Sequence, residues 1–413
     1  MKKVYFKTFG CRTNIYDTQL MIQNLKDFEV TTNEKLADIV VVNSCTVTNS
    51  ADGNARNYIN NQQKNGKKII LAGCGAFSKG EELFENNKVF GFFGHSEKSN
   101  INNLLKSEKR FKNLGDLRVV DDTIVEDFSS YTKAFIKIQE GCDFRCSYCI
   151  IPYVRGDARS LNEQKILYQI EKLANNGFGE FVLTGTNIGS YGKDTGSSIA
   201  KLLKNIGKIK GVKRVRLGSL EPIQIDNEFK ELLGESWLEK HLHIALQHTN
   251  EKMLKIMRRR NRVKEDLKLF EELYEKGYAL GTDFIVGHPG ESEEIFKNAK
   301  EMFKRFPLTH LHAFRYSPRE NTHSANLKDV VKGDKAKKRL NELQNIVYEN
   351  NYNFRRDINE SLLVLVEDEK DGLYRGYDQF YNQIFIKSDE NLSKEWIFIE
   401  KYSVKRSGNY ANI

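Results

Sequence analysis

Three cysteines in one short segment are the residues of this chain best suited to chemistry. Cys142, Cys146 and Cys149 follow an alternating apolar run, 134–139, that is typical of a strand. Thiolates at this spacing can ligate three irons of a 4Fe–4S cube, which commonly takes four cysteine ligands. The fourth iron then stays open, and an open metal position is where a substrate or cofactor binds. The loop therefore predicts a reactive iron–sulfur centre.

Zinc and disulfides are the alternatives for these three cysteines, the loop triad. A structural zinc site needs four ligands, commonly as two separated pairs, but no histidine lies in the loop and the eight histidines are scattered. Disulfides are disfavoured because no secretory segment opens the chain, which predicts a reducing, cytoplasmic compartment. The iron–sulfur cluster is therefore the favoured interpretation, with zinc as the main alternative.

Composition sets the size and the charge of the protein. A chain of 413 residues has room for two or three domains, and none of its apolar runs approaches the length of a membrane span. Lys and Arg number 65 against 56 Asp and Glu, a formal charge of +9. This balance suits a polyanionic partner such as nucleic acid, although many soluble proteins share it.

The other three cysteines each follow a predicted strand. We expect strands at 4–9, 39–43 and 68–72, and helices at 15–28, 51–63 and from 81 onward. This alternation predicts a parallel sheet flanked by helices, which binds ligands at the carboxyl ends of its strands. Cys11, Cys45 and Cys74, the strand-end triad, would meet at that edge. Three inert buried cysteines are the alternative, but the repeated placement favours a second cluster with an open iron.

Both triads resemble those of a known enzyme family. The loop triad, with Tyr148 before its last cysteine, resembles the cluster loop of radical S-adenosylmethionine (SAM) enzymes. The strand-end segments resemble the N-terminal domain of methylthiotransferases, which are radical SAM enzymes that insert a methylthio group at an unactivated carbon: Phe9-Gly10-Cys11, Asn43-Ser44-Cys45 and Gly73-Cys74. The resemblance covers nearly the whole chain.

The resemblance implies two 4Fe–4S clusters with different tasks. The loop triad would hold the cluster that cleaves SAM reductively to a 5′-deoxyadenosyl radical. The strand-end triad would hold an auxiliary cluster that carries the sulfur, and a second SAM would supply the methyl group. No catalytic residue is assigned beyond the clusters.

A second alternation of strands and helices begins at residue 133. We expect strands at 134–139, 180–183, 214–217, 243–246, 280–286 and 310–316, and helices that include 164–174 and 264–276. Six such units predict a partial (βα)6 barrel rather than a closed eight-stranded one. In the family, the segment after the second of these strands receives the amino group of SAM, and Glu221 and Gln247 are candidates for polar contacts to its ribose or methionine part. The resemblance gives six SAM contacts, although each motif alone could be an ordinary turn: Tyr148, Gly185, Thr186, Asn187, Glu221 and Gln247.

Histidines and arginines near the predicted strands receive weaker interpretations. His241 and His243 share one strand face, as do His310 and His312, and such residues are more often packed and hydrogen-bonded than metal ligands. We therefore expect no role for them. The arginine run at 258–262 is either a solvated face or a phosphate contact.

The last part of the chain changes to short predicted strands at 362–366, 383–386 and 396–399, with a turn at Asp371-Gly372. Interleaved aromatic and basic residues could stack bases and hold phosphates, and the segment loosely resembles a TRAM domain. The predicted fold is thus α/β in three domains: a methylthiotransferase domain at 1–110, a radical SAM barrel at 130–356 and a TRAM-like β domain at 357–413. A linker at about 106–131 joins the first two.

The resemblance predicts an enzyme, a tRNA methylthiotransferase. Segments 9–14 and 150–156 resemble the branch that adds a 2-methylthio group to N6-threonylcarbamoyladenosine 37 in the anticodon stem-loop. Segment 316–322 favours the tRNA branches, although Asn321 stands where a glycine is usual. The carboxylate of the threonylcarbamoyl group would need a cation, for which Arg155 and Arg319 are candidates.

Other functions stay open at this point. The family alternatives are the N6-isopentenyladenosine 37 of tRNA and an aspartate of a ribosomal protein. The alternative of another class is a non-catalytic iron–sulfur RNA-binding protein. The partners expected for the favoured function are tRNA, an electron donor such as flavodoxin or ferredoxin, and a sulfur donor, with no membrane.

Overall fold

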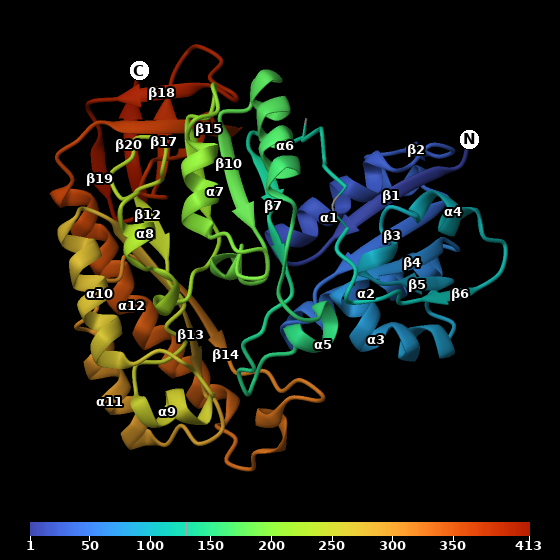
Figure 1. Cartoon of the computed structure of the whole chain (residues 1–413), viewed down its shortest axis with the longest axis horizontal. Helices are drawn as coiled ribbons and strands as arrows, with labels where there is room; N and C mark the ends of the chain where they lie inside the picture. Colours follow the sequence, from blue (N-terminus) through green and yellow to red (C-terminus); the bar gives the residue numbers. More distant parts are fainter. Residues whose placement is uncertain (122, 129) are drawn as a thin grey trace.

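The computed structural model describes residues 1–121, 123–128 and 130–413. Over these residues the chain forms three parts that follow one another in sequence (Figure 1). A parallel sheet with helices (blue) lies to the right of a curved sheet with outer helices (green to orange), and an all-β unit (red) covers the top. Among the described residues no helix is both long and apolar enough to cross a membrane.

The first part is a parallel sheet in the strand order β2-β1-β3-β4-β5-β6. Its strands are β1 (Lys3–Thr8), β2 (Glu29–Val30), β3 (Ile39–Ser44), β4 (Lys68–Gly73), β5 (Gly91–Phe93) and β6 (Phe111–Asn113). Its helices are α1 (Arg12–Gln23), α2 (Asn49–Lys64), α3 (Cys74–Glu85) and α4 (Ile101–Lys106). The β-branched residues of β3 are buried on both faces, as expected of a central parallel strand.

The helix expected from residue 81 begins seven residues earlier, at Cys74. Gly75 and Gly80 weaken the helical signal of its first half, because glycine is a poor helix former. The chain turns sharply into this helix at Gly73, whose φ is +81° and whose position leaves no room for a side chain beside the Ser44 carbonyl. Cys74 is therefore the first residue of α3 rather than part of a loop.

The second part is a partial barrel, as predicted. One parallel sheet has the order β11-β10-β7 and the other β12-β13-β14, and isolated parallel bridges such as Leu220↔Ile244 connect them. These strands are β7 (Ala134–Lys137), β10 (Glu180–Thr184), β11 (Arg214–Leu217), β12 (His241–His243), β13 (Ala279–Val286) and β14 (His310–Arg315). The strand expected at 243–246 thus lies two to three residues earlier. β8 (Gln139–Glu140) and β9 (Arg159–Ser160) pair antiparallel next to the loop triad.

Helices cover the outside of this barrel. They are α5 (Ile151–Arg155), α6 (Glu163–Asn175), α7 (Ile199–Ile206), α8 (Asn227–Lys230), α9 (Glu251–Ile256), α10 (Val263–Glu275), α11 (Glu293–Phe303) and α12 (Gly333–Asp357). Side chains cap five of these helices at their N-termini: Asn162 for α6, Ser198 for α7, Asp226 for α8, Asn250 for α9 and Ser292 for α11. Apart from α5, which packs against α3 of the first part, these helices contribute apolar residues to one core with the strands, and this core fixes the strand ends where the candidate site lies.

The third part is an all-β sheet in the order β18-β15-β16-β17-β20-β19. Its strands are β15 (Leu362–Lys370), β16 (Leu373–Tyr377), β17 (Gln383–Lys387), β18 (Trp396–Ile399), β19 (Ser403–Lys405) and β20 (Gly408–Asn412). Asp371 and Gly372 both have positive φ and form the predicted turn between β15 and β16. Arg214 and Arg216 of the barrel donate to carbonyls of this unit and hold it on the barrel.

The first part and the barrel meet at the carboxyl ends of their strands. Thr13, at the start of α1, hydrogen-bonds Thr184 at the end of β10 at 3.0 Å between the hydroxyl oxygens. Asn49 N–H donates to Ser317 Oγ, after β14, at 2.9 Å. Both predicted ligand-binding edges therefore face one another.

Candidate active site

The loop triad lies directly after β7 and β8 and is held by backbone contacts. Cys142 N–H donates to the Gly156 carbonyl at 3.0 Å, and Ser147 N–H donates to the Met257 carbonyl at 3.0 Å. Gly141 has a φ of +78°, and a Cβ there would overlap the Asp157 carbonyl. These contacts fix the loop before any ligand binds.

Two side chains donate toward the sulfurs of this loop. Asn187 Nδ2 lies 3.6 Å from Cys142 Sγ, and Arg259 Nη1 lies 3.7 Å from Cys146 Sγ. Burial raises the pKa of the Cys149 thiol to about 12, so iron has to displace a firmly held proton there. Hydrogen-bond donors to the sulfurs favour the thiolates that iron binds, and they tune the potential of a cluster.

One cavity of about 390 Å³ connects the loop triad to all six residues expected to contact SAM. The loop cysteines line it together with Cys11 of the strand-end triad. The six predicted contacts on its wall are Tyr148, Gly185, Thr186, Asn187, Glu221 and Gln247. The structure therefore brings the predicted residues together, and their binding of SAM stays a prediction.

Gln139 organises the segment after β10. Its side-chain oxygen accepts from the backbone N–H of Thr186 at 3.1 Å and of Asn187 at 2.9 Å. Thr186 Oγ1 in turn donates to the Gly141 carbonyl at 2.5 Å. A Cβ at Gly185 would lie 2.8 Å from the Gln139 carbonyl, so only glycine fits. Gln139 was not among the predicted site residues, and its one signal in the sequence was a polar residue at the end of an apolar strand.

Glu221 and Gln247 enter the cavity from other strand ends. The Glu221 carboxylate accepts from Arg259 Nη1 at 2.8 Å, and this ion pair is largely buried. Gln247 has a φ of +64°, a strained value for a residue with a side chain, which is typical of functional sites.

The contacts of Arg259 show that the arginine run at 258–262 is only partly available to a phosphate. Arg259 is buried and donates to Glu221 and to the Ala245 carbonyl, so it is not available to a phosphate. Arg258, Arg260 and Arg262 are exposed. The phosphate interpretation therefore applies only to these three.

The strand-end triad converges as predicted from the strand order. Cys11 is the N-cap of α1, Cys45 follows β3, and Cys74 begins α3. Burial and the neighbouring Cys74 raise the pKa of the Cys45 thiol to about 12, and Cys11 adds to this effect. A Cβ at Gly10 would overlap the Cys45 side chain, so the segment after β1 and the segment after β3 lie very close together. Cys11 reaches the cavity, whereas Cys45 and Cys74 are buried.

Arg155 contacts this triad from the barrel. Its Nε–H donates to Cys74 Sγ at 3.2 Å, and its other nitrogens pair with Glu140 and Asp17 at 2.6 and 3.0 Å. Lys137 and Lys98 share these carboxylates, so the group is a buried ion network between the two parts. Arg155 is thus used inside the protein and does not meet the expectation of a free cation for substrate.

Arg319, the other candidate cation, lines the cavity but is also engaged. Its guanidinium donates to Asp52, Asn49 and the Thr46 carbonyl of the first part. It holds the N-terminal part on the barrel, and its charge is already paired.

Comparisons with known proteins assign the chain to a family. Two family models match the chain: "Uncharacterized protein family UPF0004" over residues 3–94 and "Radical SAM superfamily" over residues 136–303. A Helicobacter pylori (strain J99) protein provisionally named a methylthiotransferase is 52% identical over the full length of both chains. The threonylcarbamoyladenosine tRNA methylthiotransferase MtaB of Aquifex aeolicus is 34% identical over 91% of this chain and 95% of that protein. The chain belongs to the radical SAM methylthiotransferase family.

One further relative and one solved structure are also similar to this chain. The tRNA-2-methylthio-N(6)-dimethylallyladenosine synthase of Fervidobacterium nodosum is 33% identical over 96% of this chain and 95% of that protein. Among solved structures, the radical SAM methyltransferase TsrM of Kitasatospora setae gives a TM-score of 0.61 at 15% identity, covering 79% of this chain and 77% of that one. This likeness shows the fold alone.

Membership of the family makes this methylthiotransferase an enzyme that uses SAM and a 4Fe–4S cluster. The residues present fit that cluster: three cysteines of one loop face a cavity and receive donors from Asn187 and Arg259. A non-catalytic binding protein, the alternative of another class, is therefore set aside.

Proposed function

We propose that this enzyme adds a 2-methylthio group to N6-threonylcarbamoyladenosine 37 of tRNA, using two 4Fe–4S clusters and SAM as radical source and methyl donor. The observation that carries the proposal is the shared cavity. Cys11 lines the same 390 Å³ space as the loop triad and the six expected SAM contacts. SAM, substrate carbon and sulfur could therefore meet without leaving one chamber.

The two triads would hold groups that supply reductive cleavage of SAM and a transferable sulfur. The chain's own residues position and shield them. Asn187, Arg259 and Arg155 donate to one sulfur each, of Cys142, Cys146 and Cys74. Ile150, Ile285 and Phe314 add apolar surface to the cavity, which limits the water that could quench a radical.

The choice among modified adenosines rests on the cavity rather than on the relatives. Relatives named for the threonylcarbamoyl and the dimethylallyl nucleosides are almost equally similar to this chain. Arg315 lines the cavity and is exposed, and its guanidinium makes no hydrogen bond or ion pair among the described residues. Its planar guanidinium suits the carboxylate of a threonylcarbamoyl group, whereas an isopentenyl group would offer it nothing.

Replacing Arg315 by glutamine tests this assignment. A charge-assisted hydrogen bond contributes about 1.5–3 kcal/mol, which is about 10- to 100-fold in rate or affinity. We expect Arg315→Gln to lower methylthio transfer to threonylcarbamoylated tRNA by about that factor, with SAM cleavage in the absence of tRNA unchanged. Both rates are measured by liquid chromatography with mass spectrometry.

Arg305→Gln, which removes an exposed arginine outside the cavity lining, is the matched control. Equal transfer by wild type and Arg315→Gln would remove Arg315 from the substrate site. An equal loss in both variants would indicate a general effect of charge on tRNA binding.

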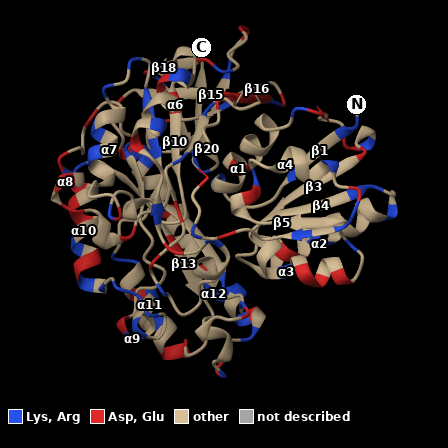
Figure 2. Ribbon diagram, turned by 45° about the vertical axis from the view of Figure 1, so that its right-hand side comes forward, with Lys and Arg blue, Asp and Glu red and all other residues tan. Residues whose placement is uncertain are grey.

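The expected contacts with tRNA involve the outside of the molecule. Figure 2 shows Lys and Arg interspersed with Asp and Glu along the outer helices of the side in view. Contacts to the phosphate backbone of tRNA would therefore come from local groups of basic residues such as Arg258, Arg260 and Arg262. The C-terminal β unit, which we propose acts as a TRAM-like domain, would add further contacts to the tRNA. The reaction also requires an electron donor such as flavodoxin or ferredoxin and a source of sulfur.

Nucleoside analysis tests the proposed function directly. Digested tRNA from cells that lack this protein should lose 2-methylthio-threonylcarbamoyladenosine and accumulate the precursor without the methylthio group. Restoring the gene should restore the nucleoside. If the isopentenyl derivative changed instead, or if only a ribosomal protein lost the mass of a methylthio group, the substrate would be wrong and the family chemistry would stand.

A further inference from the structure

Three neighbouring strands of the barrel place two histidines and an aspartate together. His243 ends β12, Asp283 lies in β13, and His312 lies in β14 directly opposite Asp283. At Gly281, the residue that pairs with His243, a Cβ would lie 2.7 Å from the His243 ring. The glycine therefore leaves the space that this imidazole fills. The sequence analysis expected no role for these histidines.

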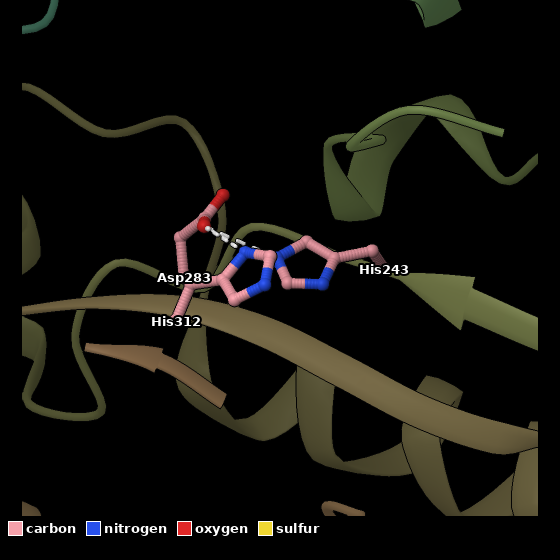
Figure 3. A group of neighbouring side chains, drawn as sticks. All are labelled: His243, Asp283 and His312. Atoms are coloured by element: carbon pink, nitrogen blue, oxygen red, sulfur yellow. Dashed lines mark ion pairs between the residues drawn. The ribbon is translucent and has the colours of Figure 1, made fainter. Parts of the chain in front are cut away.

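The three side chains converge on one point. His243 Nε2 lies 3.1 Å and His312 Nδ1 lies 3.6 Å from the same oxygen, Asp283 Oδ1. Figure 3 shows both imidazoles directed at this carboxylate from opposite strands. The ring centroids are 4.6 Å apart, and one potential ligand atom from each residue lies within 4.8 Å of the other two. No backbone rearrangement is needed to bring all three to one ion.

A second observation concerns His243 alone. Its side chain is only 7% exposed, and the Asp283 carboxylate, 3.1 Å away, is the one polar partner of its Nε2 among the described residues. The neighbouring His310, which is half-buried, contacts Thr309 Oγ1 at 2.9 Å and the Tyr381 carbonyl at 3.2 Å through its two ring nitrogens, whereas Nε2 of the buried His241 also lacks a hydrogen bond among the described residues.

Two cavities adjoin this group. His243 and His312 line a cavity of about 300 Å³, and Asp283 lines the 390 Å³ cavity that holds the loop triad. Cys11, Gly185 and Ser219 line both. The group is thus accessible, and it lies between two adjoining cavities, one of which is the proposed reaction chamber.

We propose that His243, Asp283 and His312 bind one divalent transition-metal ion of the zinc or iron(II) type. Two imidazole nitrogens and one carboxylate oxygen favour such ions over Mg²⁺ or Ca²⁺, which prefer oxygen alone. Three protein ligands leave a position for an oxygen donor from the cavity, as in catalytic rather than structural sites. Neither cysteine triad contributes to this site, so it does not depend on the proposed function.

Zinc binding to the full-length protein with both clusters reconstituted tests the site. After exposure to Zn²⁺ and desalting, elemental analysis should find about one zinc per chain. His312→Ala and Asp283→Asn should each lose this zinc with unchanged iron content. His312 is the safest position to change because its side chain is 61% exposed. His323→Ala, at another exposed histidine, should bind zinc like the wild type.

X-ray absorption separates this site from the cysteines. The proposal requires nitrogen and oxygen ligands at about 2.0–2.1 Å from zinc, whereas thiolates would lie at about 2.3 Å. Three results would each overturn the proposal. They are zinc that persists in both variants, sulfur ligands around the zinc, and a wild-type protein that takes up no zinc, cobalt or further iron. In that case the group is a metal-free set of ion pairs.

Discussion

Replacing Cys142, Cys146 and Cys149 together by alanine is expected to remove half of the iron and all SAM cleavage. The wild type should bind about eight irons per chain if both cubes fill, and the variant about four. The physical reason is that the loop triad lies in the barrel, while the strand-end triad is held by β1, β3 and α3 of the first part. Anaerobic reconstitution followed by iron analysis gives the first value, and release of 5′-deoxyadenosine under reduction gives the second.

The strand-end triad provides the matched control. Changing Cys11, Cys45 and Cys74 to alanine should also leave about four irons, but this variant should keep SAM cleavage. Full iron retention in the loop variant, or zinc as the metal of the wild type, would contradict the assignment of the loop. Loss of all iron in either variant would mean that the two sites do not form independently.

The parts of the fold that depend on local pattern were predictable from sequence. The buried β-branched run at 39–42 and the alternating runs of the barrel predicted strands within one to three residues. The turn at Asp371-Gly372 was predictable because both residues tolerate positive φ. The early start of α3 was not, because Gly75 and Gly80 hide a helix that tertiary packing stabilises.

The candidate site likewise contains some residues that were predictable from sequence and others that were not. Motifs after successive strands predicted the cavity wall, because the carboxyl ends of parallel strands share one edge. Three residues of the site could not be predicted because their partners lie 15 or more positions away in the sequence, and no motif encodes such contacts: Arg155, Arg259 and Gln139. Arg155 contacts Cys74 in another part of the chain, and Arg259 contacts Glu221. The His243–Asp283–His312 group likewise needs the register of three strands.

Cys45→Ala is expected to separate the two activities that the family chemistry combines. Cys45 is buried, lies against Gly10, and belongs to the first part of the chain, whereas the residues expected to contact SAM line the cavity from the barrel. Loss of one of three ligands should empty or disable the auxiliary cluster. Methylthio transfer should then fall below detection, while 5′-deoxyadenosine release stays close to that of the wild type.

The position of Arg155 makes this separation a demanding test. Arg155 joins Cys74 to Glu140, which lies two residues before Cys142, so the two triads are connected through one buried guanidinium. Arg155 donates its hydrogen bond to Cys74 rather than to Cys45, so Cys45 is the better position for isolating the proposed auxiliary site. Cys74→Ala would remove the sulfur to which Arg155 donates and could disturb both sites. If Cys45→Ala lost SAM cleavage as completely as transfer, the division of labour between the triads would be wrong. If only Cys74→Ala did so, the buried network would be the route by which one site depends on the other.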